Sequence, residues 1–341
     1  MQKIVLLFLS CLAQSTVSWE ISKITTPEIS IPHSAYWDDD TQSLYFVGFV
    51  TSGAQASIFR YNSTDGVFYS AYIDGVQSPS FIIPTNKKVC EICKKCGEKL
   101  FAVGIDHDVV VVKWNGKSTK AKIVSSIFSV ENNNPSVRYD VAATDSSGRL
   151  YTGSVSQTLC NATATRSLYR YTRTAGVDRL FGGLISSTGI AFNEKLGKMY
   201  HFDSCQLLLT EYDYDPKTGD ICNGRVVLEY PLNGIPINTN LPFGLAIDSK
   251  GMLYTSVYTG SVWKINPWTS TVVEIINLPV PGALGLAFGG IHRNILYVIT
   301  GSVILDALSS KVIKEVTDGS SIYAISGLDS EGLPLTRMDV K

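Results

Sequence analysis

The chain has 341 residues, a hydrophobic fraction of 45% and a formal net charge of −1. This composition is ordinary for a globular protein with a large core. The near-zero charge excludes a basic footprint for nucleic acid and a polybasic patch for anionic membranes. Length alone would allow two domains, but all-β folds often exceed about 250 residues as a single unit.

The first residues predict a secretion signal. A positive charge precedes the apolar run Ile4–Ala13, and the small residues Ser15 and Ser18 each suit cleavage. The run is too short to cross a bilayer, and no later stretch is long and apolar enough. We expect a signal peptide over residues 1–18, a single domain over residues 19–341, and a secreted, extracellular protein without a membrane span.

A strand–turn–strand phrase recurs along the rest of the chain. Each copy has a short apolar strand, a polar turn that often contains Gly or Asp, and a β-branched or aromatic strand. In chain order the copies are "SAYWDDDTQSLYFVGF", "SFIIPTNKKVCEICKKCGEKLFAVGI", "YDVAATDSSGRLYTGSV", "TGIAFNEKLGKMYHFD", "FGLAIDSKGMLYTSVY" and "LGLAFGGIHRNILYVIT". The units are spaced by roughly 40 to 60 residues, which is the length of a four-stranded blade.

These units predict an all-β fold, a six-bladed β-propeller of four-stranded antiparallel blades. A pair of β-sandwiches is the alternative, but six similar units favour a closed ring. The strands "GIAF", "GLAI" and "GLAF" are expected to be innermost, with glycine where they crowd around the channel. We expect the segment "EISKITT" to close the ring by pairing with the last blade near "LPLTRMDV".

Two triplets and six cysteines agree with secretion. "NST" at Asn62 and "NAT" at Asn161 are N-glycosylation acceptors. Six cysteines remain after the signal, an even number that suggests disulfides in an oxidising compartment. These disulfide candidates are Cys90, Cys93, Cys96, Cys160, Cys205 and Cys222.

The cysteine spacing gives two more specific expectations. Cys90, Cys93 and Cys96 share a loop in the second unit, where disulfide bonding is favoured over a metal site. Cys160 and Cys205 each follow the second strand of neighbouring blades. Those strand ends lie on one face of a propeller, so a Cys160–Cys205 disulfide is predicted.

Few other residues point to chemistry. His107, His201 and His292 lie in strand or turn segments, where structural roles are expected. Asp38–Asp40 is expected to form a solvated turn. The sequence contains no nucleophile elbow, phosphate-binding loop or zinc-protease motif.

The phrases resemble the senescence-marker-protein, gluconolactonase and luciferin-regenerating-enzyme family, which includes regucalcin. "YWDDDTQSLYFVGF" resembles the family's opening W-D-x-x-T-x-x-L-Y-F-V-D. "SFIIP", "KMYHFDSCQLLLTEYDYDPKTGDICNGR", "LAFGGIHRNILYVIT" and "IYAISGL" are similar to family segments in the same order. The resemblance runs from about Ile31 to Val340. It implies a divalent cation, held at the top of the channel by one Glu, one Asn and one Asp, that activates water against a sugar lactone.

The chain departs from this pattern at all three family ligands. The Glu of the family's G-E-G-P-x-W corresponds to His33, the Asn of N-G-L-x-W to Thr188, and the Asp of P-D-G to Phe243. Two anionic oxygens and an amide oxygen thus become an imidazole, a hydroxyl and an apolar ring. A hard cation loses its negative charge and most of its donors.

The substrate side of the family site is altered too. The family's R-x-N-D-G-K resembles "RYDVAA", which keeps Arg138 and places Asp140 at the Asn position. These two residues either bond a polar ligand at the channel mouth or pair with each other or solvent.

Three functional hypotheses follow. The favoured one is a non-catalytic binder of a small, apolar or pigment-like ligand or of an extracellular protein partner, without cofactor or nucleic acid. The second is a metal-dependent lactonase or related hydrolase, whose rearranged site uses His33 and Asp140 with a cation such as calcium or zinc. The third is a structural role without a ligand. Metal content and lactone hydrolysis distinguish the first two.

Overall fold

The structure is a computed structural model. It describes residues 18–49, 57–76, 79–86, 99–132, 134, 137–156, 160, 163–229, 241–306 and 311–340. The predicted signal peptide except Ser18, the cysteines Cys90, Cys93 and Cys96, and Asn161 lie outside these residues.

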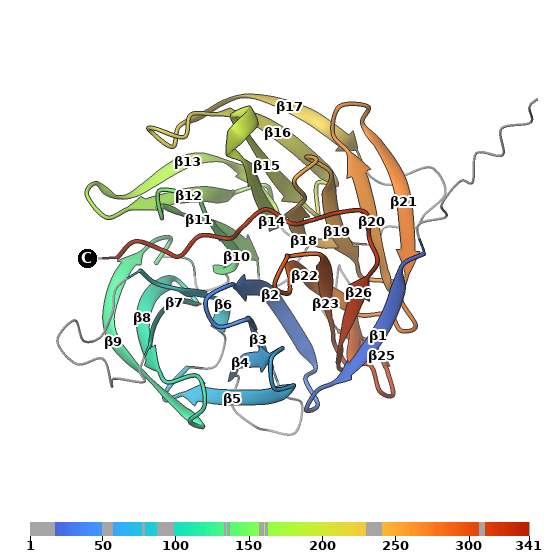
Figure 1. The fold of residues 1–341 in the computed structure, drawn as a ribbon. Coiled ribbons are helices and arrows are strands. Elements are labelled where there is room, and N and C mark those ends of the chain that lie inside the picture. The colour runs from blue at the N-terminus through green and yellow to red at the C-terminus, as the bar shows by residue number, and fades with distance from the viewer. Residues whose placement is uncertain are drawn as a thin grey trace, which may run out of the picture.

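The fold is an all-β propeller, as predicted, and its sheets surround a central axis (Figure 1). Three sheets are simple four-stranded antiparallel meanders. The first comprises β10 (Val137–Thr144), β11 (Leu150–Ser156), β12 (Arg166–Thr172) and β13 (Gly176–Leu184). The second comprises β14 (Ser187–Asn193), β15 (Lys198–Asp203), β16 (Leu208–Tyr214) and β17 (Ile221–Glu229). The third comprises β18 (Pro242–Ile247), β19 (Leu253–Val257), β20 (Ser261–Asn266) and β21 (Thr271–Asn277).

A larger sheet of eight strands follows the order β2-β3-β4-β5-β9-β8-β7-β6. It comprises β2 (Ile31–Asp38), β3 (Ser43–Phe49), β4 (Ser57–Asn62), β5 (Val67–Ile73), β6 (Pro79–Pro84), β7 (Lys99–Ile105), β8 (Asp108–Trp114) and β9 (Lys120–Ser129). Two antiparallel halves meet where β5 and β9 pair in parallel, at Tyr72–Lys120 and Ile73–Ala121. Because this short parallel pairing joins the halves, the six predicted blades do not form six separate sheets.

The remaining sheet closes the ring with the N-terminal strand. It comprises β22 (Ala283–Gly289), β23 (Ile295–Thr300), β26 (Ser321–Ser326) and β1 (Glu20–Thr25). A separate hairpin comprises β24 (Val303–Leu305) and β25 (Val312–Glu315), and the 3₁₀ turn η1 (Glu194–Leu196) is the single helical element in the described part. The predicted role of "EISKITT" in closure is therefore confirmed.

The predicted partner of that strand was wrong. β1 pairs with β26, the "SIYAIS" segment, and not with "LPLTRMDV". The latter segment, which we call the C-terminal strap (residues 333–340), crosses one end of the ring (Figure 1). The Leu333 amide donates to the Ile247 carbonyl at 3.1 Å, and the Met338 amide donates to the Pro84 carbonyl at 3.0 Å. The strap thus bridges the ends of innermost strands.

The innermost strands β2, β6, β10, β14, β18 and β22 contact one another in cyclic order. Glycine permits this crowding where two strands converge. A Cβ on Gly244, whose φ is +70°, would lie 3.3 Å from the Cα of Gly285 on the neighbouring strand. The prediction that glycine marks crowded innermost strands is confirmed at this position.

The recurring Asp of the phrase has a defined role in its turn. The Asp145 carboxylate accepts the backbone amides of Ser147 and Arg149, both at 3.0 Å. Asp248 does the same for Lys250 and Met252, at 3.0 and 2.8 Å. An Asp side chain that satisfies amides two and four residues onward fixes a tight turn, so these two copies connect their first two strands in the same way.

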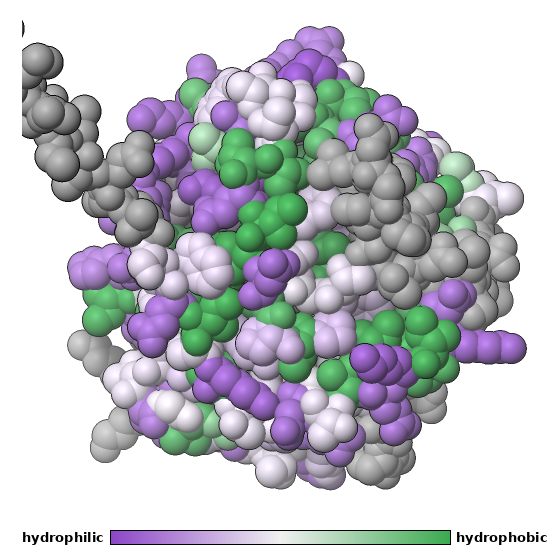
Figure 2. All heavy atoms as spheres, turned by 90° about the vertical axis from the view of Figure 1, so that its right-hand side faces the viewer, coloured by the Kyte–Doolittle hydropathy of each residue, from purple (hydrophilic) through white to green (hydrophobic). Residues whose placement is uncertain are grey.

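The flank of the ring is a mixed surface. Figure 2 shows this side, where apolar side chains are interspersed with polar ones. Trp268, Val273 and Ile275, on β21 or the turn before it, are about half exposed. In the part of the chain that the structure describes, no helix has the length and hydropathy to span a membrane.

Candidate functional site

The residues of the candidate site lie at or next to β-bulges in the innermost strands. The register of β2 shifts between His33 and Tyr36, and that of β10 between Tyr139 and Val141. Corresponding shifts occur in β14 and β18, at Ser187–Gly189 and Phe243–Ala246. A bulge re-aims side chains and is common next to functional sites. The predicted residues thus sit at or beside bulges near the starts of four innermost strands, β2, β10, β14 and β18.

His33 is buried in an environment without a hydrogen-bond partner. It is 6% exposed, and neither ring nitrogen has a partner in the described structure. Its ring stacks on Phe49 with a centroid separation of 5.9 Å. Burial lowers the pKa of His33 to about 4, while Asp140 raises it and Arg138 lowers it further. The imidazole is therefore neutral at neutral pH and faces the charges of Arg138 and Asp140.

Arg138 and Asp140 pair with each other. Arg138 Nη1 donates to Asp140 Oδ1 at 3.0 Å and to the Tyr139 carbonyl at 3.0 Å. Both side chains are largely buried, at 18% and 13% exposed. The sequence left open whether these residues bond a ligand, each other or solvent, and in the structure they pair with each other.

The Thr188 hydroxyl forms hydrogen bonds with other buried groups of the protein. Its Oγ1 is in hydrogen-bond contact with Ser204 Oγ and lies 3.3 Å from the Pro242 carbonyl oxygen. Both hydroxyl-bearing residues are buried. This oxygen is therefore committed to joining β14 to the segment that begins β18.

Phe243 provides an apolar ring next to Thr188. The ring packs edge-on against Tyr258, with centroids 5.7 Å apart, and belongs to the largest buried apolar cluster. No lone pair is available on this side chain. The structure brings together His33, Arg138 and Asp140, whereas the Thr188 hydroxyl is bonded to the start of β18 and the Phe243 ring is packed in an apolar cluster.

These residues do not fit a divalent cation of the family type. Hard cations prefer several anionic oxygens. Asp140 is the one carboxylate at the five positions, and it is neutralised by Arg138. The described residues contain no group of three or more His, Cys, Asp or Glu side chains arranged to hold a metal ion.

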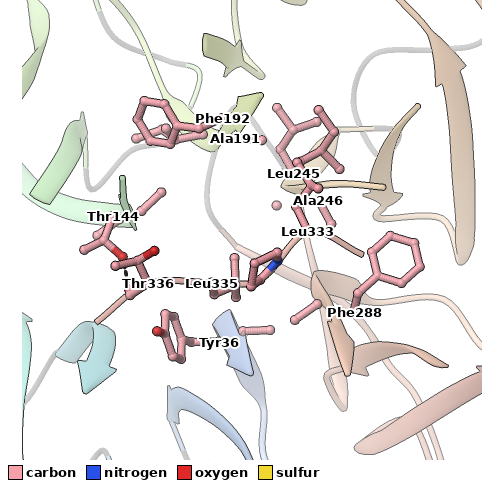
Figure 3. A pocket seen from close by; sticks show the side chains of 18 of the residues that line it. Tyr36, Thr144, Ala191, Phe192, Leu245, Ala246, Phe288, Leu333, Leu335 and Thr336 are labelled. Atoms are coloured by element: carbon pink, nitrogen blue, oxygen red, sulfur yellow. Dashed lines mark hydrogen bonds between the residues drawn. The ribbon is translucent and has the colours of Figure 1, made fainter. Parts of the chain in front are cut away.

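A cavity of about 300 Å³ is lined by residues of the innermost strands from the bulges onward. Five of these strands and the C-terminal strap line it, and Figure 3 shows their side chains around the space. The lining is mostly apolar, with Leu245, Phe288 and Leu333 among the larger residues. Sequence reasoning missed this cavity, because small residues on five strands carry no periodic signal.

The acidic turn predicted to be solvated is instead partly buried. Asp38 is 4% exposed and accepts from Arg337 Nη2 at 2.6 Å, while Asp40 pairs with the same guanidinium at 2.9 Å. Asp39 accepts from Arg293 at 3.1 Å. The turn therefore anchors the strap beside the cavity, and the prediction was wrong for Asp38 because its partner lies about 300 positions away in the chain.

Among known families, that described as SMP-30/Gluconolactonase/LRE-like region matches residues 31–302. The chain belongs to this family. Chicken (Gallus gallus) regucalcin is 22% identical over 321 residues, which cover 93% of this chain and 97% of that protein.

Solved structures agree with the family assignment. A luciferin-regenerating enzyme superposes with a TM-score of 0.81 at 26% identity, covering 95% of this chain and all of that one. A regucalcin of Agrobacterium tumefaciens, described as calcium-binding, gives a TM-score of 0.70 at 14% identity and covers 94% of this chain and 97% of its own. The expected family resemblance is thus confirmed, and the second structure supports the fold alone.

The predicted disulfide between neighbouring sheets is present. Cys160 and Cys205 are bonded, with their Cα atoms 5.0 Å apart. Cys222 is an exposed free thiol in the described structure, so its place among the disulfide candidates is not supported. It lies on β17, the last strand of its sheet.

Removing the disulfide should lower thermal stability. The bond closes a segment of 45 residues, for which the chain-entropy argument gives about 3–4 kcal/mol. We expect the double variant Cys160→Ser/Cys205→Ser to melt several degrees below the wild type in a calorimetric scan. Cys222→Ser is the matched control and should melt as the wild type does. Equal melting temperatures for all three proteins would contradict the expected stabilisation.

Proposed function

We propose that this chain is a secreted, six-bladed member of its family that binds a small ligand without hydrolysing it. The eight-stranded sheet counts as two blades in this proposal, because each half is a four-stranded meander with its own innermost strand. The observation that carries the loss of catalysis is the donor set at the family's metal positions.

That donor set supports neither cation binding nor water activation. Thr188 Oγ1 is hydrogen-bonded internally, Phe243 offers a hydrocarbon ring, and His33 is a lone neutral imidazole. A cation at such a site would be held by too few charged oxygens to lower the pKa of a bound water. The other two polar side chains of the site, Arg138 and Asp140, form an ion pair with each other.

Secretion is supported by the apolar N-terminal run and by the disulfide. A structural disulfide is typical of oxidising compartments. Asn62 ends β4 at a hairpin turn and is partly exposed, as a glycan acceptor requires. The single domain over residues 19–341 and an extracellular ligand or protein partner belong to the same proposal.

Metal content and lactone hydrolysis test the loss of catalysis. The purified secreted protein should contain no stoichiometric calcium, manganese or zinc by mass spectrometry after dialysis against each ion. It should also show no hydrolysis of gluconolactone above the rate in buffer. A tightly held ion together with turnover would overturn the proposal.

One observation favours a second candidate function, the rearranged metal-dependent hydrolase. Both nitrogens of His33 are buried without a partner, and a neutral imidazole near a carboxylate is a transition-metal ligand type. In that case zinc would bind with turnover, and His33→Ala would abolish both. An inactive, metal-free wild type removes this candidate.

A further inference from the structure

The cavity is lined by residues that follow the family's metal positions along the innermost strands, and none of those positions lines it. His33, Thr188 and Phe243 lie near the starts of their strands, and the cavity is lined by later residues of the same strands. The strap closes the end of the ring toward which these strands run, because it contacts the turns that follow them. A ligand there would be separate from the altered metal site.

The cavity exists because small side chains line it from several directions. Six alanines contribute to its wall, namely Ala35, Ala142, Ala143, Ala191, Ala246 and Ala287. Close packing is the rule in protein interiors, and each void forfeits dispersion contacts. A mostly apolar cavity of this kind suits apolar molecules. At about 300 Å³ it lies at the lower end of the size range of ligand pockets.

Tyr36 contributes to the wall, but its hydroxyl does not face the cavity. The residue is 5% exposed, and its oxygen is fully buried and makes no hydrogen bond within the described structure. Its ring belongs to a buried cluster that includes Phe81 and Tyr139. Among the described lining residues, no other side chain has a buried polar atom without a partner. The wall therefore favours a ligand that is mainly apolar.

The charged lining residues favour an uncharged ligand. Glu194 and Lys195 lie in the turn after β14, and Glu194 accepts from the Ser146 amide and hydroxyl. The strap's Arg337 does not line the cavity and is paired with Asp38 and Asp40. No charged side chain comes from the strands themselves among the described lining residues, so a charged ligand would be desolvated without compensation.

The strap forms the remaining wall and marks the access route. Leu333 and Thr336 are held by hydrogen bonds to the Ile247 carbonyl and from the Thr144 hydroxyl. Leu335, between them, lines the cavity and is 45% exposed. The cavity therefore borders solvent at Leu335.

We propose that this cavity binds a small, uncharged and mainly apolar molecule. The inference rests on the proposed function and adds to it the location and chemical class of the ligand. It also separates the ligand site from the positions that the family uses for metal.

The test uses the full secreted protein and an uncharged fluorescent probe, N-phenyl-1-naphthylamine. We expect one probe per chain, and binding at least tenfold weaker for its sulfonated relative 8-anilinonaphthalene-1-sulfonate. Ala246→Phe and Ala142→Phe fill the cavity from two different strands, and each should weaken binding of the uncharged probe at least tenfold. Ala175→Phe, in an exposed hairpin turn, is the matched control and should bind as the wild type does.

The outcomes separate the two proposals. Circular dichroism and thermal unfolding establish that each variant is folded, and either cavity variant suffices. Wild-type affinity in a folded cavity variant would overturn the location but leave non-catalytic binding in place. No binding by a metal-free, inactive wild type would overturn the inference alone. No binding by a wild type that holds metal and hydrolyses lactone would overturn both.

Discussion

Lowering the pH from 7 to 5 should destabilise the protein by about 4 kcal/mol through two buried histidines. Burial lowers the pKa of His33 to about 4 and that of His201 to about 3, from an ordinary value of 6.5. Between the folded and unfolded pKa values, the two imidazoles are therefore protonated in the unfolded chain but not in the folded chain. This stability is present in full above pH 6.5 and declines as the pH falls toward the folded values, at about 2 kcal/mol per histidine by pH 5.

The two histidines differ in their surroundings. His201 Nε2 is paired with Ser187 Oγ at 2.8 Å, whereas His33 has no partner in the described structure. His201→Gln keeps a hydrogen-bonding group, and His33→Leu removes an unsatisfied one. Each variant should lose about half of the pH dependence, and His33→Leu should be near neutral at pH 7.

Urea unfolding at pH 7 and pH 5 measures this effect. The exposed His292 provides the control, because His292→Gln should keep the wild-type difference between the two pH values. If both buried-site variants also kept that difference, the acid sensitivity would have to come from other groups and the assignment to His33 and His201 would fail.

The repeated phrase shows how far local sequence determines this fold. Asp145 and Asp248 fix equivalent turns through amides two and four residues onward. Because those bonds are local, the strands, the turns and the positions of Cys160 and Cys205 were predictable. The innermost glycines were predictable for a related reason, since crowding at the axis follows from the ring itself.

The features that the sequence did not predict depend on contacts between residues far apart in the chain, or on the empty volume left between strands. The local sequence around Asp38 is typical of a solvated acidic turn, and its ion-pair partner Arg337 lies near the other end of the chain. The sequence placed the partner of β1 near the strap, whereas the partner is β26. Both C-terminal segments contain strand-forming residues, so only the observed pairing with β1 distinguishes them. The cavity is the space left by alanines on separate strands, and no spacing along one strand encodes it.

The same turn chemistry yields the other large effect. Asp145→Ala should destabilise the protein by about 3–5 kcal/mol, because it leaves a buried guanidinium without its carboxylate. The Asp145 side chain is 0% exposed, and that of Arg149, its ion-pair partner, is 10% exposed. Burial on its own lowers the pKa of Arg149, and contact with Asp145 more than offsets this.

This pair also joins two sheets. Arg149 donates to the carbonyls of Pro216 and Lys217 at 2.6 and 2.9 Å, and the Tyr214 hydroxyl donates to Asp145 at 2.8 Å. These partners lie on β16 or in the turn after it. Loss of the carboxylate should therefore loosen the contact between neighbouring sheets as well as the turn.

Asp248→Ala is the matched control within the same protein. Asp248 makes the same two amide bonds and accepts from the Tyr254 hydroxyl at 3.3 Å, but Met252 stands where the other copy has Arg149. Its loss should cost about 1–3 kcal/mol in urea unfolding, the range for unsatisfied buried groups. The difference between the two variants then measures the orphaned guanidinium. Equal losses would mean that the turn dominates in both copies and that the ion pair between sheets adds nothing.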